Sequence, residues 1–158
     1  KIIYTRKQML LNINKLTNNS RICIDGKLLS ADINNVVLEV INKLNSKDSI
    51  YLFTGEPRIK ITGRGKGSRC AHLALALLSE LKDQFPLDII SFATDGLDNS
   101  EYAGVAFKTQ ELFKKTSLKE IDKYLANFDS YSFFEKYKCT IKTGPLPVNV
   151  SDLLIISR

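Results

Sequence analysis

The stretch GRGKGSRCAHLALALLSELKDQ, from Gly63 to Gln84, joins a basic glycine-rich segment directly to a strongly apolar helical pattern. Leucine and alanine favour a helix over residues 69–84, and Pro86 cannot continue it because proline lacks a backbone N–H. A loop that leads into a helix places free N–H groups at the first helical turn, where they attract anions. The stretch therefore predicts one helix with an anion-binding site at its beginning.

Strand and helix patterns alternate on both sides of this helix. Amphipathic spacing predicts helices over residues 6–16 and 31–44, and two or three short helices between residues 108 and 137. Short apolar runs predict strands over residues 21–25, 49–54, 88–94, 138–142 and 153–156, while residues 103–107 fit a strand or a helix start. Residues 58–62 alternate apolar and polar side chains, as in a hairpin or a strand bend. The alternation indicates an α/β domain, layered α/β/α, with a mainly parallel, mixed sheet.

Length and composition fit one soluble globular domain, with 158 residues, 44% hydrophobic and 25% charged. The apolar run Leu73–Leu78 is too short to cross a bilayer, and the first ten residues lack the apolar region of a signal peptide. Three cysteines without close spacing and one histidine argue against a disulfide framework or a zinc site. We therefore expect a cytoplasmic protein without a membrane partner.

The formal net charge of +6 fits acidic partners, either phosphorylated small molecules or nucleic acid. Basic residues gather between residues 58 and 69, around the glycines. The chain has no interleaving of aromatic and basic residues and no helix-turn-helix or zinc-finger pattern. These observations favour a small anion over nucleic acid as the ligand.

The candidate anion site is the glycine-rich segment itself. Glycine lets a backbone approach a ligand closely, and arginine can bind a phosphate or carboxylate with two hydrogen bonds. The spacing matches neither a Walker A loop nor a dinucleotide fingerprint. The alternative is a mobile basic loop without a ligand. The candidate phosphate-binding residues are Gly63, Gly65, Lys66, Gly67, Ser68 and Arg69.

Two further polar segments follow predicted strands or join them. Asp95 and Asp98 flank Gly96 after a buried strand, where carboxylates could hold Mg²⁺ or orient a hydroxyl group. The alternative is an Asp-Gly turn in which Asp98 only caps a helix. Asn149 lies in a proline-containing loop and could donate to a ligand, unless the prolines serve only to fix a turn.

Cys70 and His72 lie in the first turns of the predicted helix. A helix N-terminus next to Arg69 could lower the pKa of the Cys70 thiol and make it reactive. The alternative is that Cys70 is a small packing residue. His72 is expected to face solvent or a partner group rather than a reacting group.

Taken together, the segments resemble one family. The order and approximate spacing of its motifs are similar to the MOFRL-type domain, which is the C-terminal domain of the glycerate 2-kinases. The match covers roughly residues 49–158, and residues 1–48 form a helix–strand–helix lead-in that resembles more weakly the segment before this domain. The motifs are TGEPRIKITGRGKGSR, LALALL, ATDGLD, AGV, NFDSYSFF, TGP and NVSDLLI.

The resemblance implies transfer of phosphate from ATP, with Mg²⁺, to D-glycerate, giving 2-phosphoglycerate. It places the site in a cleft between this domain and an N-terminal Rossmann-like domain. Arg69 would meet phosphate or substrate, and Asp95 and Asp98 would be the acidic pair after the central strand, which could hold Mg²⁺. Gly96 would contact substrate or phosphate, and Glu56 and Asn149 would line the cleft. Without the N-terminal domain, we expect no turnover from this chain alone.

Several positions depart from the family pattern. Cys70, Ala71 and His72 stand where the family prefers Asn-Gln-Glu after the cleft arginine, and Leu146–Val148 replaces a polar Thr-Gly-Thr. These departures keep open a diverged, non-catalytic module that binds an anion or a nucleotide. The family has also been labelled as hydroxypyruvate reductase, but a reductase is the weaker alternative because the sequence has no dinucleotide fingerprint.

Overall fold

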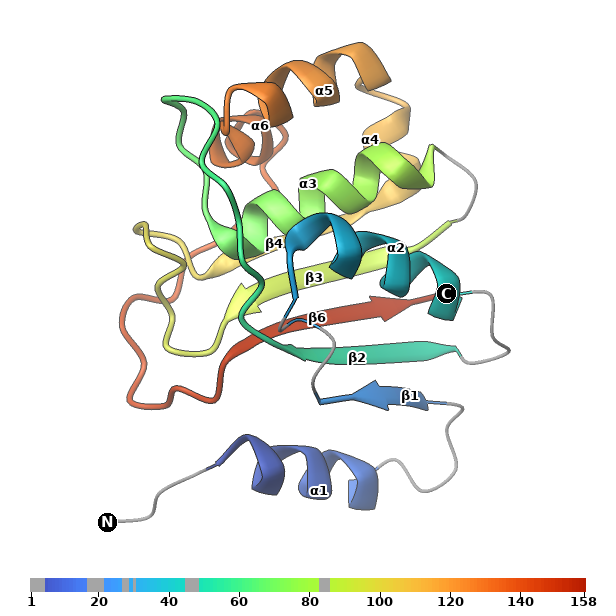
Figure 1. Cartoon of the computed structure of the whole chain (residues 1–158), viewed down its shortest axis with the longest axis vertical. Helices are drawn as coiled ribbons and strands as arrows, with labels where there is room; N and C mark the ends of the chain where they lie inside the picture. The colour runs from blue at the N-terminus through green and yellow to red at the C-terminus, as the bar shows by residue number, and fades with distance from the viewer. Residues whose placement is uncertain (1–4, 17–21, 27–28, 30, 45–48, 83–85) are drawn as a thin grey trace.

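The computed structural model describes residues 5–16, 22–26, 29, 31–44, 49–82 and 86–158, in which helices and strands alternate (Figure 1). The helices are α1 (Arg6–Leu16), α2 (Ile33–Leu44), α3 (Arg69–Leu81), α4 (Thr109–Phe113), α5 (Leu118–Ala126) and α6 (Ser130–Lys136). The strands are β1 (Ile22–Asp25), β2 (Ile50–Gly55), β3 (Asp88–Ala93), β4 (Gly104–Lys108), β5 (Thr140–Ile141) and β6 (Asp152–Ser157). The predicted α/β class is confirmed.

The strands form one mixed sheet in the order β1-β2-β6-β3-β4-β5. β1 and β2 are parallel, whereas the pairs β2–β6, β6–β3, β3–β4 and β4–β5 are antiparallel. The expectation that most of the sheet is parallel was therefore wrong. Hydrophobic periodicity identifies a strand but carries no information about its direction or its neighbours.

The position of β6 creates one polar edge of the sheet. β6 runs antiparallel to both β2 and β3, which therefore point the same way. Asp152, the first residue of β6, pairs in register with Gly55 at the end of β2 and with Ala93 at the end of β3. Residues that follow β2 and β3, and residues that precede β6, consequently gather at the same edge.

Helix α3 lies at the centre of the hydrophobic core. It contacts β3, β4 and β6 of the sheet and the helices α2, α5 and α6. Burial of one leucine side chain contributes about 1.5–3 kcal/mol, so the leucine-rich face of α3 provides much of the stability. The helix begins at Arg69, as predicted, and ends at Leu81, where Lys82 adopts a left-handed φ of 45°. The buried apolar residues of α3 are Cys70, Ala71, Leu73, Ala74, Leu75, Leu77, Leu78 and Leu81.

The helices are distributed unevenly over the two faces of the sheet. α2, α3, α5 and α6 pack together, whereas α1 lies beside β1 at the far edge (Figure 1). On β3, Ile89 is buried but its neighbour Ile90, which points to the opposite face, is 37% exposed. Over β3, the described residues therefore provide one helical layer, where the α/β/α expectation placed two.

Residues 58–62 are extended but belong to no strand within the described part of the chain. The backbone N–H of Arg58 donates to the carbonyl of Ala31, and the N–H of Ile33 donates to the carbonyl of Arg58. Ile61 is 69% exposed, so the apolar alternation does not mark a buried face here. The prediction of a hairpin or strand bend was wrong, because the segment forms only an isolated parallel bridge, between Arg58 and Asp32 just before α2.

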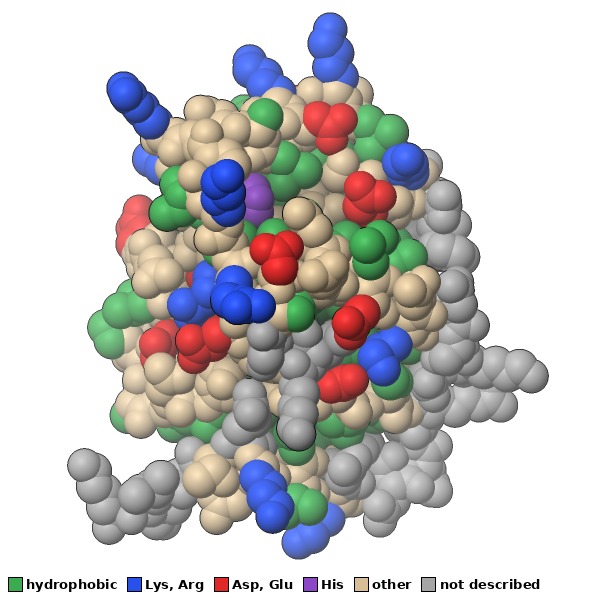
Figure 2. Space-filling model, viewed as in Figure 1, with side chains coloured by type: hydrophobic (Ala, Val, Ile, Leu, Met, Phe, Trp, Pro, Cys, Tyr) green, Lys and Arg blue, Asp and Glu red, His purple; other side chains and the backbone are tan. Residues whose placement is uncertain are grey.

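The surface carries both signs of charge. On the face drawn in Figure 2, lysine and arginine side chains are interspersed with acidic ones. Within the described ranges, no helix combines the length and the apolar character that a membrane span requires. The division into a lead-in over residues 1–48 and a following portion stays a prediction, although α2 shares one hydrophobic cluster with α3 and β2.

Candidate functional site

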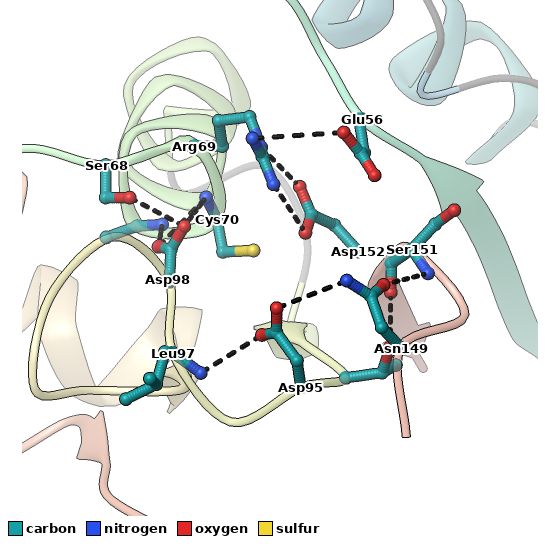
Figure 3. A network of polar contacts seen from close by, with 12 residues as sticks. Glu56, Ser68, Arg69, Cys70, Asp95, Leu97, Asp98, Asn149, Ser151 and Asp152 are labelled. Atoms are coloured by element: carbon teal, nitrogen blue, oxygen red, sulfur yellow. Dashed lines mark hydrogen bonds and ion pairs between the residues drawn. The ribbon is translucent and has the colours of Figure 1, made fainter. Parts of the chain in front are cut away.

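The polar edge of the sheet brings together residues that are far apart in the sequence (Figure 3). Glu56 follows β2, Asp95 follows β3 and Asn149 precedes β6, while Arg69 begins α3. Asp152, at the first position of β6, lies between them and contacts Arg69. Four of the predicted site residues thus lie at this edge, together with one acidic residue that the sequence interpretation did not select.

Arg69 is held by a bidentate ion pair. Its Nε donates to Oδ2 of Asp152 at 2.8 Å, and its Nη2 donates to Oδ1 at 3.3 Å. Its Nη1 lies 3.9 Å from Oε2 of Glu56, which is longer than a hydrogen bond. The Arg69 side chain is 31% exposed and that of Asp152 only 5%. One edge of the guanidinium is therefore bound inside the protein, while Nη1 keeps N–H donors for a ligand.

The charges of this pair depend on each other. The hydrogen bond to Asp152 raises the pKa of Arg69 above its ordinary value, so the guanidinium remains cationic. Burial raises the pKa of Asp152, and the hydrogen bond from Arg69 opposes this effect. The pair as a whole is neutral: the guanidinium of Arg69 is its partly exposed cation, and the carboxylate of Asp152 is its buried counter-charge.

Asp98 occupies the N-terminus of α3 and is 1% exposed. Its Oδ1 accepts a hydrogen bond from the Ser68 hydroxyl at 2.6 Å, and its Oδ2 accepts one from the Tyr131 hydroxyl at 2.9 Å. The backbone N–H of Cys70 lies 3.2 and 3.1 Å from the two oxygens, and that of Ala71 donates to Oδ2 at 3.2 Å. These five contacts fill the four lone-pair positions of a carboxylate. The arrangement corresponds to the capping alternative for Asp98.

The negative charge that the sequence predicts at the beginning of α3 is therefore supplied by the protein itself, as the carboxylate of Asp98. A carboxylate at this position satisfies the free N–H groups and interacts favourably with the helix dipole. Ser68, a candidate phosphate ligand, directs its hydroxyl to Asp98 instead. An external phosphate would have to displace Asp98 to reach these N–H groups. Among the predicted anion ligands, Arg69 remains a candidate.

The glycine-rich segment packs against residues 127–129, which connect α5 to α6. The N–H of Gly65 donates to the carbonyl of Asn127 at 3.0 Å, and the N–H of Lys66 donates to Oδ1 of Asp129 at 2.8 Å. These contacts do not fit a free basic loop. The glycines here allow two backbone segments to touch, which is a structural role beside any role toward a ligand. A Cβ atom would overlap this connection at Gly63, Gly65 and Gly67.

Lys66 and two tyrosines line a pocket on the other side of the glycine-rich segment. The pocket has a volume of about 380 Å³ and includes Lys66, Tyr102 and Tyr131. Glu101 and Glu135 line the same pocket, so its charges are mixed rather than basic. Neither Arg69 nor Asp152 lines this pocket.

Asp95 and Asn149 connect the two loops at the polar edge. Nδ2 of Asn149 donates to Oδ2 of Asp95 at 3.3 Å, and the N–H of Leu97 donates to Oδ1 at 3.2 Å. Gly96 adopts a φ of 85°, and a Cβ there would overlap the carbonyl of Gly144. Asp95 and Asn149, two predicted site residues, thus bind each other. Gly96 is required for the turn that follows Asp95, because another residue would be strained there and its Cβ would not fit.

Cys70 is buried, whereas His72 is half-buried and visible at the surface in Figure 2. Burial raises the pKa of the Cys70 thiol, which is the opposite of the shift that a reactive cysteine needs. The ring of His72 packs 4.8 Å from that of Phe128, and burial lowers its pKa. Nδ1 of His72 is buried and has no hydrogen-bond partner among the described residues. The packing alternative holds for Cys70, and His72 does not reach the polar edge.

The two predicted metal ligands differ in their fit to Mg²⁺. The oxygens of Asp98 are filled by hydrogen bonds, so this carboxylate does not fit as a ligand. Asp95 is only partly buried, and its carboxylate accepts two long hydrogen bonds, so it fits as a single carboxylate ligand. Among the described residues, no group of three or more His, Cys, Asp or Glu side chains could hold a metal by itself. Mg²⁺ commonly binds proteins through one or two carboxylates together with substrate phosphates.

Sequence reasoning missed Asp152 and the hydrogen bond from the Tyr131 hydroxyl to Asp98. Asp152 lies in the recognised motif NVSDLLI, beside apolar neighbours. An acidic residue at the start of an otherwise apolar strand was a usable signal, because a buried carboxylate needs a partner. Its partner, Arg69, lies 83 positions earlier and could not be identified from spacing.

Comparison with known proteins identifies a family that matches most of the chain. The MOFRL family matches residues 49–152. A glycerate 2-kinase of Sulfurisphaera tokodaii is 30% identical over 98% of this chain, which corresponds to 39% of that relative. A D-glycerate 2-kinase of Thermotoga maritima is 32% identical over 69% of this chain and 27% of its own length. The chain spans only about 20–39% of the length of the curated relatives that it matches.

A solved structure shares the fold. The crystal structure of a glycerate kinase from Thermotoga maritima superposes with a TM-score of 0.73 over 97% of this chain and 40% of that chain. The sequence identity in this superposition is 24%, so the likeness concerns the fold alone.

Proposed function

The chain belongs to the MOFRL family, and we propose that it is the C-terminal domain of a glycerate 2-kinase-like enzyme. In this proposal it forms one half of an inter-domain cleft in which D-glycerate is phosphorylated by ATP to 2-phosphoglycerate. Identity to two glycerate 2-kinases supports the proposal. The relatives are more than twice as long as this chain, which is consistent with a further, N-terminal Rossmann-like domain as the partner.

The observation that carries the proposal is the convergence of polar residues at one edge of the sheet. Glu56, Arg69, Asp95 and Asn149 come from three motifs and lie together at the polar edge formed by β2, β3 and β6. Phosphoryl transfer depends chiefly on positioning and on stabilisation of charge, and a fixed arginine supplies both. A domain that covers this edge would enclose the site from the other side.

In the proposed reaction, each residue of this edge has a distinct task. Nη1 of Arg69 would donate to oxygens of a phosphate or of the glycerate carboxylate. Asp95 would hold Mg²⁺ or orient the attacking hydroxyl group. Glu56 lies close to Nη1 and would repel a bare anion, which favours a phosphate that carries a cation. A bound Mg²⁺–ATP complex would supply the phosphoryl group and neutralise its charge.

Asp98 has an indirect task in this proposal. It binds the backbone at the start of α3, and Arg69 is the first residue of that helix. By fixing the first turn, Asp98 would fix the position from which the Arg69 side chain extends. Its role would be to position the site rather than to bind metal.

A reconstitution assay tests the proposal. The chain alone, the N-terminal part of a glycerate 2-kinase relative alone, and their mixture are assayed for 2-phosphoglycerate formed from D-glycerate and ATP. We expect turnover only from the mixture, or from a fusion of the two, and a loss of at least about 100-fold with Arg69→Ala, as for removal of a group that stabilises transition-state charge. Robust turnover by the chain alone would contradict the proposal, as would a fully active Arg69→Ala fusion.

One observation favours a second candidate, a diverged module that binds an anion or a nucleotide without catalysis. Cys70 and Ala71 are buried, and His72 packs against Phe128, so the three positions where the family prefers Asn-Gln-Glu give no polar group to the cleft. Replacing Cys70, Ala71 and His72 together by Asn-Gln-Glu discriminates the two candidates. Turnover that appears only in this triple variant would identify the natural chain as the binding module.

A further inference from the structure

We infer that Asp152 is a positioning residue, which locks the guanidinium of Arg69 in the orientation that presents Nη1 to the cleft. The inference rests on the proposed function, because it assigns the residue that prepares Arg69 for its ligand. It adds a carboxylate that neither the motif match nor the sequence pattern had selected.

The backbone of Asp152 is an unusually rigid place for this task. As the first residue of β6, it pairs in register with Gly55 on one side and with Ala93 on the other. Because a strand pairs with it on each side, the backbone of Asp152 is held in place when the Arg69 side chain moves. The Asp152 side chain is only 5% exposed, and both of its oxygens accept hydrogen bonds from Arg69, which restrains rotation of the carboxylate.

The geometry of the pair selects one edge of the guanidinium. Asp152 binds Nε and Nη2 at 2.8 and 3.3 Å, and such a two-point contact fixes the plane of the group as well as its position. Arg69 would otherwise sample many rotamers, because its side chain has four rotatable bonds and is about one third exposed. With Nε and Nη2 bound, Nη1 points toward Glu56 and the cleft.

A role of Asp152 in charge balance alone predicts the opposite change in phosphate binding. If Asp152 only balanced the charge of Arg69, its removal would make the site more positive and strengthen the binding of a phosphate. If Asp152 positions the guanidinium, its removal frees the side chain and weakens the binding despite the more favourable charge. Asp152→Asn and Glu56→Gln form a matched pair, because each removes one negative charge beside Arg69 with little change in volume.

The first measurement follows the Nε–H signal of Arg69 in ¹H–¹⁵N NMR spectra of the chain without ligand. We expect exchange with water to become at least about 10-fold faster in Asp152→Asn, because a protecting charged hydrogen bond is lost. Exchange should stay unchanged in Glu56→Gln, which alters only the Nη1 side. Backbone spectra of both variants verify that the fold is retained.

The second measurement titrates the same proteins with inorganic phosphate. Asp152→Asn should bind at least about 10-fold more weakly than the natural chain, whereas Glu56→Gln should bind about 3-fold more tightly. Tighter or equal binding by Asp152→Asn, together with unchanged Nε–H exchange, would overturn the inference. If the natural chain binds no phosphate, the proposed anion site fails, and the exchange rates alone then decide whether Asp152 orients Arg69.

Discussion

Two carboxylates bind the first turn of α3 in different ways, Asp98 through its backbone and Asp152 through one of its side chains. Asp98 binds the backbone of the turn and is completely filled by hydrogen bonds from protein groups. Asp152 binds the side chain of Arg69 and contacts only one edge of its guanidinium, the one formed by Nε and Nη2. A helix N-terminus can thus be satisfied from within the protein, while a side chain of the same turn stays partly exposed and keeps N–H donors that make no hydrogen bond to Asp98 or Asp152.

Asp98→Ala should give the largest effect on stability. The substitution leaves two backbone N–H groups and the hydroxyls of Ser68 and Tyr131 without their acceptor in a buried place. We expect the free energy of unfolding to fall by about 3 kcal/mol. Denaturant titration of the chain measures this change.

Asp95→Ala is the matched control for that experiment. Asp95 lies three positions earlier and makes two longer contacts at the partly exposed edge. Its removal should cost less than about 1 kcal/mol. Equal losses for the two substitutions would contradict the distinction between a filled cap and an open edge.

Gly65→Ala tests whether the glycine-rich segment is packed or open. The added Cβ would overlap Asp129, so we expect a loss of about 2 kcal/mol from overpacking. Arg64→Ala, at the exposed neighbouring position, should change stability by less than about 0.5 kcal/mol. A neutral Gly65→Ala would mean that the segment is a free loop in solution, and the contrast with the open edge at Arg69 would disappear.

The pH dependence contributed by His72 should be the smallest effect. Burial lowers the pKa of His72 in the folded chain below its ordinary value of 6.5. The unfolded chain therefore binds more protons just below pH 6.5, so stability is fully present above this pH and falls as the pH decreases. Carboxylates also titrate in acid, so the natural chain is compared with His72→Phe by thermal unfolding between pH 7.5 and 5. Parallel curves for the two proteins would show that His72 does not contribute.

Local patterns predicted the elements of this protein well. The helix that begins at Arg69, the amphipathic helix α2 and the strand β3 follow directly from apolar periodicity, which is a property of neighbouring residues. Local sequence also explains the beginning of α5, where the Ser117 hydroxyl accepts a hydrogen bond from the backbone N–H of Glu120. Strand direction depends instead on which segments meet, so the antiparallel placement of β6 was not predictable.

The candidate site shows the same limit. Glycine spacing correctly marked residues 63–69 as unusual, but it could not distinguish close approach to a ligand from close approach to residues 127–129. Similarly, the acidic pair after β3 was identified, but only the three-dimensional structure separates buried Asp98 from more accessible Asp95. The decisive partner of Arg69 was missed because the pairing spans 83 residues.

The central place of β6 also has a consequence for the order of folding. β6 follows every other strand along the chain, yet it separates β2 from β3 and supplies both with hydrogen-bonded neighbours. During synthesis, β2 and β3 therefore lack their shared partner until residues 152–157 have emerged. Contacts of such long sequence separation slow folding, and the exposed edges of waiting strands are sites for wrong pairing. Completion of the sheet and charge pairing of Arg69 thus occur in the same late step.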